Sequence, residues 1–237
     1  MKAFHTIAIP HKDIMEGRLT MDVFAADLWE VSEKRGPDEY KDPETFFKRT
    51  YLTQGLENIL SVVEKRLRGN GGDPVIQIQT PFGGGKTHSL IAMYHKAEEW
   101  DAKRVVLVGT ALTTKETIWG IIEKQLTGKT ERFPENRWGA SKKEIRELLE
   151  AHQPVLILMD EVLEYVTKAA GVKVADSTLA AQTIAFMQEL TEAAASLDKV
   201  CIVVTLPSSI IEHYDPSAEK LYQQLEKVAG LVEKIYA

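Results

Sequence analysis

A glycine-rich octapeptide is the residue pattern best suited to chemistry, because it follows a short apolar run and opens a helical pattern. Its residues are Thr80, Pro81, Phe82, Gly83, Gly84, Gly85, Lys86 and Thr87. Glycines let a backbone wrap closely around an anion, in conformations that a Cβ would obstruct. Lys86 is then expected to reach the β- and γ-phosphates of ATP and Thr87 to bind Mg²⁺, while the helix N-terminus adds its dipole. The segment therefore predicts a phosphate-binding loop.

The two ends of this segment leave alternatives open. Thr80 stands where such loops usually begin with glycine, so the alternative is a glycine-rich turn that merely precedes Lys-Thr. We keep Thr80 in the predicted site, because the first position makes the least direct contact with phosphate. His88 follows on the first helical turn, and we include it among the cofactor-binding residues. Packing of His88 against the sheet is the alternative, and it is slightly favoured.

Two adjacent carboxylates, Asp160 and Glu161, end the apolar run at 154–160. An Asp at the C-terminal end of a strand beside a phosphate loop can hold the Mg²⁺ shell. Glu161 would then be placed to polarise a water for attack on the γ-phosphate. A solvated turn or helix cap is the alternative, and it would be the better explanation without the loop at 80–87. Together the two motifs predict a nucleotide site.

A third and weaker candidate is Thr205, near the end of the apolar run at 199–206. Ligands of doubly wound sheets bind at the carboxyl ends of strands, so this hydroxyl is expected to sense the γ-phosphate or the attacking water. The alternative is a threonine that satisfies local backbone. The six histidines and the single cysteine, Cys201, show no zinc-like pairing, so Mg²⁺ is the only metal expected.

The elements that must position these residues are short strands alternating with helices. Apolar runs at 74–80, 104–110, 154–160 and 199–206 predict four strands, and helical patterns separate them. Such alternation predicts right-handed crossovers and a mainly parallel sheet, in an α/β sandwich of three layers. We therefore assign residues 73–237 to the core.

Residues 1–72 precede the first strand and read as a helical segment packed on that core. Asp42 and Thr53 are expected to cap helices, the first with a proline in its opening turn. Phe46, Phe47 and Tyr51 lie where an N-terminal segment could shelter an adenine ring. Packing of these rings in the core is the favoured alternative.

Composition narrows the class of protein. The 237 residues include 44% hydrophobic and 27% charged side chains, and the formal net charge is −6. The single cysteine excludes a disulfide scaffold, and the hydrophobic content excludes a disordered chain. The negative net charge argues against broad adhesion to nucleic acid or anionic lipid. No apolar stretch approaches the length that spans a bilayer, so we expect a cytoplasmic protein without a membrane partner.

Taken together, the loop, the Asp-Glu strand and the polar strand end resemble the additional-strand division of P-loop NTPases, specifically the AAA+ superfamily. Longer segments are similar to a bacterial and archaeal family of large ATP-binding proteins catalogued as a domain of unknown function, some encoded beside DNA methylases and helicases in phage-defence clusters. These segments are VFAADLWEV, EYKDPETFFKRTYLT, QTPFGGGKTHSLIAMYH, WGIIEKQLTG, LILMDEVLEYV and VVTLPSS. The resemblance implies triphosphate binding by Gly83 to Thr87, Mg²⁺ binding by Thr87 and Asp160, catalysis by Glu161 and sensing by Thr205.

The C-terminal region departs from the pattern of that superfamily. AAA+ modules normally continue into an arginine finger, a fifth strand and a helical lid, whereas this sequence ends in EKVAGLVEKIYA. We expect a nucleotide-binding core without the lid, derived from the N-terminal part of a longer protein. Leu231, after Gly230, stands where an arginine would be sought. Because such a finger adds several orders of magnitude to the rate, hydrolysis is expected to be slow or to need a homo-oligomer or another partner that supplies it.

The leading hypothesis is therefore ATP·Mg²⁺ binding with hydrolysis by a water that Glu161 polarises, while Lys86 and the loop amides neutralise charge. One alternative is an interaction switch that binds nucleotide without significant hydrolysis. Another is the ATPase module of a DNA-acting defence complex, with nucleic acid implied only through the family. A kinase is disfavoured, because a Glu beside the Asp suits water activation better than transfer to a hydroxyl.

Overall fold

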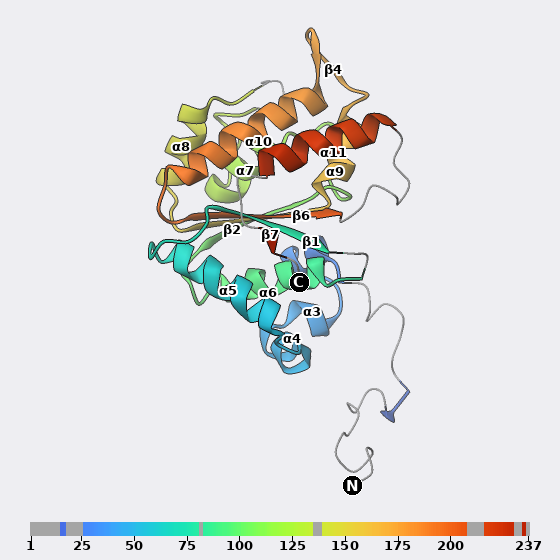
Figure 1. Cartoon of the computed structure of the whole chain (residues 1–237), viewed down its shortest axis with the longest axis vertical. Helices are drawn as coiled ribbons and strands as arrows, with labels where there is room; N and C mark the ends of the chain where they lie inside the picture. The colour runs from blue at the N-terminus through green and yellow to red at the C-terminus, as the bar shows by residue number, and fades with distance from the viewer. Residues whose placement is uncertain are drawn as a thin grey trace.

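The computed structural model describes residues 15–17, 26–80, 83–134, 139–207, 216–229 and 234–235. Its centre is a five-stranded parallel sheet with helices on both faces (Figure 1). The strands are β1 (Val75–Thr80), β2 (Lys103–Val108), β3 (Val155–Asp160), β6 (Val200–Pro207) and β7 (Lys234–Ile235), in the order β2-β3-β6-β1-β7. The predicted α/β class, the mainly parallel sheet and the four predicted strands are confirmed.

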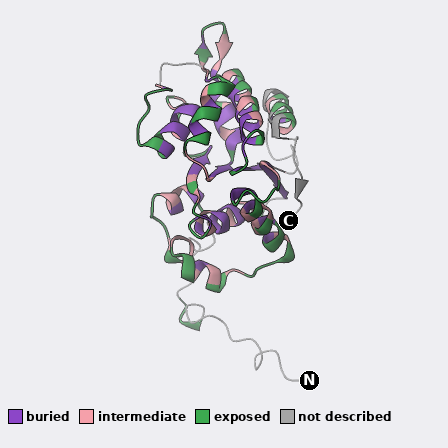
Figure 2. Cartoon of the chain, turned by 90° about the vertical axis from the view of Figure 1, so that its left-hand side faces the viewer, coloured by how far each residue is buried: buried purple, intermediate pink, exposed green. Residues whose placement is uncertain are grey.

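Side chains of each central strand alternate between two cores, one on each face of the sheet, as the pleat requires. Along β3, Ile157 belongs to the core beneath one helical layer and Leu158 to the core beneath the other. Figure 2 shows the buried residues concentrated along the sheet and on the helix faces that cover it. Burial on both faces explains why these strands are nearly continuous runs of aliphatic residues.

One face of the sheet is covered by the N-terminal helices together with the helix that follows β1. These helices are α2 (Leu28–Ser32), α3 (Asp38–Lys41), α4 (Pro43–Arg49), α5 (Gln54–Leu67) and α6 (Lys86–Lys96). The predicted caps are confirmed: the Asp42 carboxylate accepts the N–H of Thr45 and the Thr53 hydroxyl accepts the N–H of Leu56. The N-terminal helices and the sheet therefore share one core.

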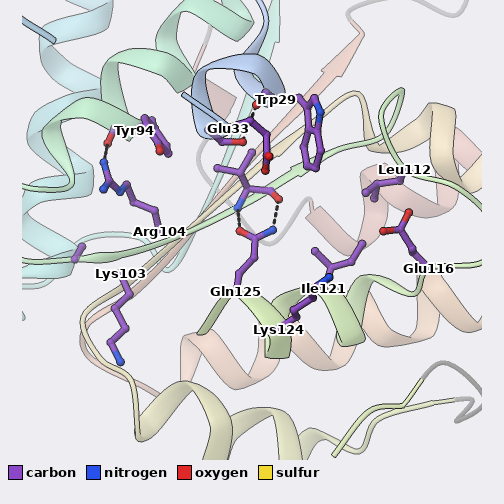
Figure 3. A pocket seen from close by; sticks show the side chains of 13 residues that line it. Trp29, Glu33, Tyr94, Lys103, Arg104, Leu112, Glu116, Ile121, Lys124 and Gln125 are labelled. Atoms are coloured by element: carbon purple, nitrogen blue, oxygen red, sulfur yellow. Dashed lines mark hydrogen bonds between the residues drawn. The ribbon is translucent and has the colours of Figure 1, made fainter. Parts of the chain in front are cut away.

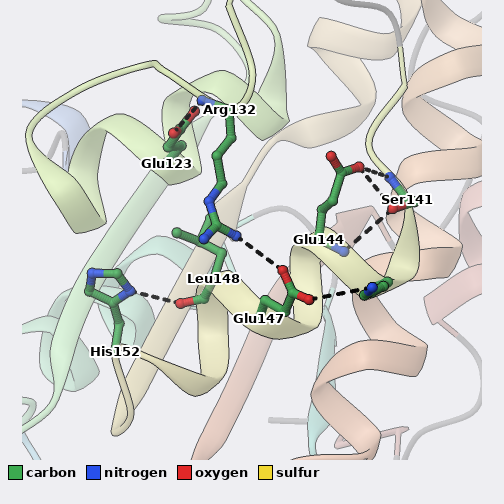
Figure 4. A network of polar contacts seen from close by, with 8 residues as sticks. Glu123, Arg132, Ser141, Glu144, Glu147, Leu148 and His152 are labelled. Atoms are coloured by element: carbon green, nitrogen blue, oxygen red, sulfur yellow. Dashed lines mark hydrogen bonds and ion pairs between the residues drawn. The ribbon is translucent and has the colours of Figure 1, made fainter.

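The other face carries five helices, which are α7 (Ile118–Thr127), α8 (Lys142–Glu150), α9 (Val162–Ala169), α10 (Leu179–Ala195) and α11 (Pro216–Ala229). A capping box of Ser141 and Glu144 starts α8 (Figure 4). The buried Glu123 carboxylate of α7 accepts the backbone N–H groups of Arg132 and Phe133, and so fastens the following loop. No described helix combines the length and the apolar character that crossing a membrane requires.

The end of the chain corrects one expectation. We expected no fifth strand, yet Lys234–Ile235 forms β7 and pairs in parallel with Gln77 and Ile78 of β1. A strand of two residues is too short to show the alternation of apolar and polar side chains that predicts a strand. It is recognised only by its pairing with β1. A second short feature, the hairpin of β4 (Lys173–Val174) and β5 (Ser177–Thr178), was missed for the same reason.

Candidate functional site

The described part of the glycine loop joins β1 to α6 in a conformation that requires glycine. Gly83 has φ 76° and Gly85, the N-cap of α6, has φ 75°, both in the left-handed region. A Cβ placed on either residue would meet no atom within 4 Å. Glycine is therefore favoured at these two positions by the left-handed backbone conformation and not by a lack of space for a side chain. Pro81 and Phe82 of the predicted site lie outside the described residues.

Lys86, the first residue of α6, reaches back across the loop. Its Nζ donates to the carbonyl oxygen of Thr80 at 2.9 Å. Thr80, at the end of β1, is 1% exposed, so its carbonyl lies at the base of the loop. This hydrogen bond holds the lysine ammonium over the loop that Gly83 and Gly85 shape.

Two hydroxyls meet on the carboxylate of Asp160, which is 3% exposed. The Thr87 hydroxyl donates to Oδ2 at 2.7 Å, and the Thr205 hydroxyl donates to Oδ1 at 2.5 Å. These residues come from the start of α6 and from the ends of β3 and β6. The sheet order β3-β6-β1 places those ends side by side, which brings residues 73 and 45 positions from Asp160 into direct contact.

Glu161 is held at the same edge of the sheet in a conformation that is uncommon for a residue with a side chain. Its φ of 50° is left-handed, and its N–H donates to the Thr205 hydroxyl at 3.3 Å. Its carboxylate is exposed and accepts a hydrogen bond from the Thr110 hydroxyl at 2.8 Å. Gly109 allows this turn, because a Cβ there would lie 2.0 Å from the Glu161 carbonyl oxygen.

Sequence reasoning missed Thr110 and Lys168. Thr110 follows β2, the neighbour of β3, so the argument that singled out Thr205 also applied to it. Lys168 of α9 donates to the carbonyl oxygens of Gly109 and Thr110, both at 3.2 Å. No pattern in the sequence pointed to Lys168, because its role depends on how α9 packs beside the end of β2.

His88 packs against the N-terminal helices, whereas the alternative described above placed it against the sheet. Its Nε2 shares a hydrogen bond of 3.0 Å with the Thr50 hydroxyl, and its ring centroid lies 4.6 Å from that of Phe46. Burial lowers the pKa of His88, which favours the neutral imidazole. Phe46 is fully buried, whereas Tyr51 is 85% exposed. The rings that we considered together are thus divided between the core and the surface.

Comparisons with known proteins give a family and distant structural likenesses. A family model described as DUF499 N-terminal domain matches residues 6–116 and 109–237. No curated protein matches the chain. Among solved structures, C. elegans PCH-2 is similar at 15% sequence identity and a TM-score of 0.42. The match covers 83% of this chain but only 46% of PCH-2, and so distant a likeness carries no inference about function.

Proposed function

The chain belongs to the DUF499 N-terminal domain family, and we propose that it binds ATP with Mg²⁺ and hydrolyses ATP slowly or only when assembled. The observation that carries this proposal is the meeting of the Thr87 and Thr205 hydroxyls on the buried carboxylate of Asp160, beside a loop of left-handed glycines. A solvated turn would not bury this carboxylate and supply it with two hydroxyl donors from other elements.

The strand order supports the proposed P-loop NTPase fold of the additional-strand, AAA+-like type. β6 lies between β1, which leads into the glycine loop, and β3, which ends in Asp160. In this proposal residues 73–237 form the nucleotide-binding core, and residues 1–72 form a helical segment packed on it. The triphosphate would bind along residues 80–87, where Gly83, Gly84 and Gly85 direct backbone N–H groups to it.

The residues around Asp160 suit Mg²⁺, because hydroxyl and carboxylate oxygens are hard ligands. Thr87 and Asp160 would hold the ion, and nucleotide oxygens and water would complete its shell. The described residues contain no group of three or more His, Cys, Asp or Glu that could hold a metal. When bound, Mg²⁺ would supply positive charge that offsets the charge developing on the phosphates.

Glu161 is the proposed base that polarises the attacking water. Its exposed carboxylate lies next to Asp160 along the chain and faces solvent, where a water can reach it. The Thr110 hydroxyl engages Oε2 at 2.8 Å and orients the carboxylate, and the remaining lone pairs can accept a hydrogen bond from water. Lys86 would neutralise charge on the phosphates, and Thr205, which contacts both Asp160 and Glu161, would sense the γ-phosphate.

Dependence on assembly follows from the distribution of arginines. Residues 201–237 contain no arginine, and Gly230 and Leu231, where one was sought, lie outside the described residues. An arginine finger contributes about 10³–10⁵ in rate when a partner supplies it. We therefore propose that turnover rises with protein concentration or with a partner protein.

Two substitutions test the site. Lys86→Ala should abolish binding of a fluorescent ATP analogue, whereas Glu161→Gln should keep binding and stop phosphate release. Lys65→Ala, on α5, is the matched control and should change neither. Binding of ATP by the Lys86 variant as tightly as by the parent would show that the site is misassigned.

A second candidate function is an interaction switch that binds ATP without significant hydrolysis. The Thr110–Glu161 hydrogen bond favours it, because the proposed base is engaged in the described state. Phosphate release measured at several protein concentrations, with and without DNA, separates the candidates. DNA stimulation with a steep salt dependence would support the ATPase module of a DNA-acting complex instead.

A further inference from the structure

A groove of about 620 Å³ lies at the edge of the sheet, away from the glycine loop (Figure 3). Its floor is β2, which among the described strands pairs only with β3. Trp29 of α2 and Ile121 of α7 stand on opposite walls, and Tyr94 of α6 lies at one end. A volume of this size falls within the range of about 300–1,000 Å³ typical of ligand sites.

The floor of this groove is an incomplete strand edge. Lys103 donates its N–H to Pro154, just before β3, and Gly109 donates to Asp160, so by alternation Arg104, Val106 and Val108 turn their peptide groups outward. The Val108 carbonyl already accepts the N–H groups of Ala111 and Leu112, which leaves Arg104 and Val106 as the edge. The side-chain amide of Gln125 pairs with Val106 on that outer side: Nε2 donates to its carbonyl and Oε1 accepts from its N–H, each at 2.8 Å. One primary amide thus occupies the place that a peptide group of an added strand would take.

Positive charge collects around the same edge. Lys103, Arg104 and Lys124 line the groove, and none of them forms an ion pair with a carboxylate of the described residues. The two lining carboxylates are engaged elsewhere, Glu33 by Arg35 at 3.0 Å and Glu116 by Thr113. Three cations without acidic partners stand out in a chain with net charge −6, and they suit an anionic occupant.

We propose that this groove binds an extended, acidic peptide segment of a partner protein, which adds to the edge of β2 and displaces the Gln125 side chain. Main-chain hydrogen bonds to Arg104 and Val106 would supply affinity, and alternate acidic side chains would meet Lys103 and Lys124 on the face of the sheet that α7 covers. Edge strands commonly invite such pairing unless they are covered, and the Val106 peptide group is hydrogen-bonded here by one exposed side chain, that of Gln125.

The same contacts disfavour a nucleic acid. A strand edge offers alternating donors and acceptors, and a sugar-phosphate backbone has no N–H groups with which to match them. Base stacking on Tyr94 is blocked, because the Arg104 guanidinium lies 4.5 Å from its ring centroid and donates to its carbonyl. An acidic peptide can both pair with the lysine and arginine side chains and hydrogen-bond to the peptide groups at the edge of β2.

The test is fluorescence anisotropy of the full chain with a labelled octapeptide of alternating Glu and Val. We expect saturable binding that slows hydrogen exchange at Arg104 and Val106. The same peptide N-methylated at every second residue, and a Lys/Val octapeptide, should bind at least about tenfold more weakly. Binding by the N-methylated peptide as tight as by the parent would overturn strand addition.

Variants locate the site independently. Gln125→Ala removes the competing amide and favours the helix, so it should tighten binding about fivefold. Lys103→Glu should weaken binding about fivefold, through repulsion of the acidic side chains. Gln188→Ala on α10 and Lys143→Glu on α8 are the matched controls and should leave binding unchanged. Equal effects of the groove and control variants, no binding even to the Gln125 variant, or preferential binding of an oligothymidylate would each refute the proposal.

Discussion

The Thr205 hydroxyl is the most informative single group to remove, because it joins β6 to both acidic residues of the candidate site. Thr205→Val keeps the shape of the side chain and deletes the donor to Asp160 Oδ1 and the acceptor for the Glu161 N–H. The residue is 3% exposed, so water cannot take over these bonds without opening the core. The substitution therefore tests a buried, charge-assisted hydrogen bond almost in isolation.

The expected loss of stability is worked from the two bonds. A hydrogen bond to a charged group contributes about 1.5–3 kcal/mol, and the 2.5 Å bond to Asp160 is of this kind. The 3.3 Å bond to Glu161 is long and should add at most about 1 kcal/mol. Because the swap leaves no cavity, we expect Thr205→Val to lower the free energy of unfolding by about 2–3 kcal/mol.

Urea unfolding of four proteins measures this value: the parent, Thr205→Val, Asp160→Asn and the double variant. With a neutral amide at 160, Thr205→Val should cost only about 1 kcal/mol, which gives a coupling energy of about 1–2 kcal/mol. Thr191→Val is the matched control, because that buried hydroxyl donates to the Gln188 carbonyl of its own helix. It should cost less than about 1 kcal/mol.

Two results would refute the reasoning. One is a cost of Thr205→Val that is the same with Asp160 as with Asn at that position, since the hydroxyl would then not interact with the charge. The other is a cost no greater than that of Thr191→Val. Thr205→Ser, which keeps the donor, should recover most of the loss, so a failure of this rescue would point to packing instead.

Three further predictions concern buried features away from that bond. Arg66→Met should lower the free energy of unfolding by about 3 kcal/mol in thermal melts, because the buried guanidinium donates to the carbonyls of Val200, Ala194 and Leu197. Gly109→Ala should stop phosphate release and destabilise the fold more than Gly128→Ala, whose Cβ would meet open space. Burial raises the pKa of Cys201 to about 12, above its ordinary value of 9.0. The unfolded thiol ionises first, so the contribution of Cys201 to stability should be constant below about pH 9 and fall as pH rises toward 12. A thiol reagent at about pH 9 should label only unfolded protein.

The sequence by itself determined the α/β class, the positions of the four long strands and the helix caps at Asp42 and Thr53. Each of these depends on neighbours in the chain: aliphatic runs mark strands buried on two faces, and a cap bonds an N–H three residues ahead. The glycine loop belongs to the same group, because the left-handed φ of Gly83 and Gly85 is a local requirement.

The tertiary structure decided which of several candidate side chains meet. Only the strand order β2-β3-β6-β1-β7 brings Thr87 and Thr205 to Asp160, and only the packing of α9 brings Lys168 to the end of β2. β7 and the groove beside β2 are likewise invisible in the sequence. The two residues of β7 are a strand because they pair with β1, and the groove lies where β2 has an unpaired edge among the described strands. Both features depend on which strands pair, and strand pairing joins residues far apart in the sequence.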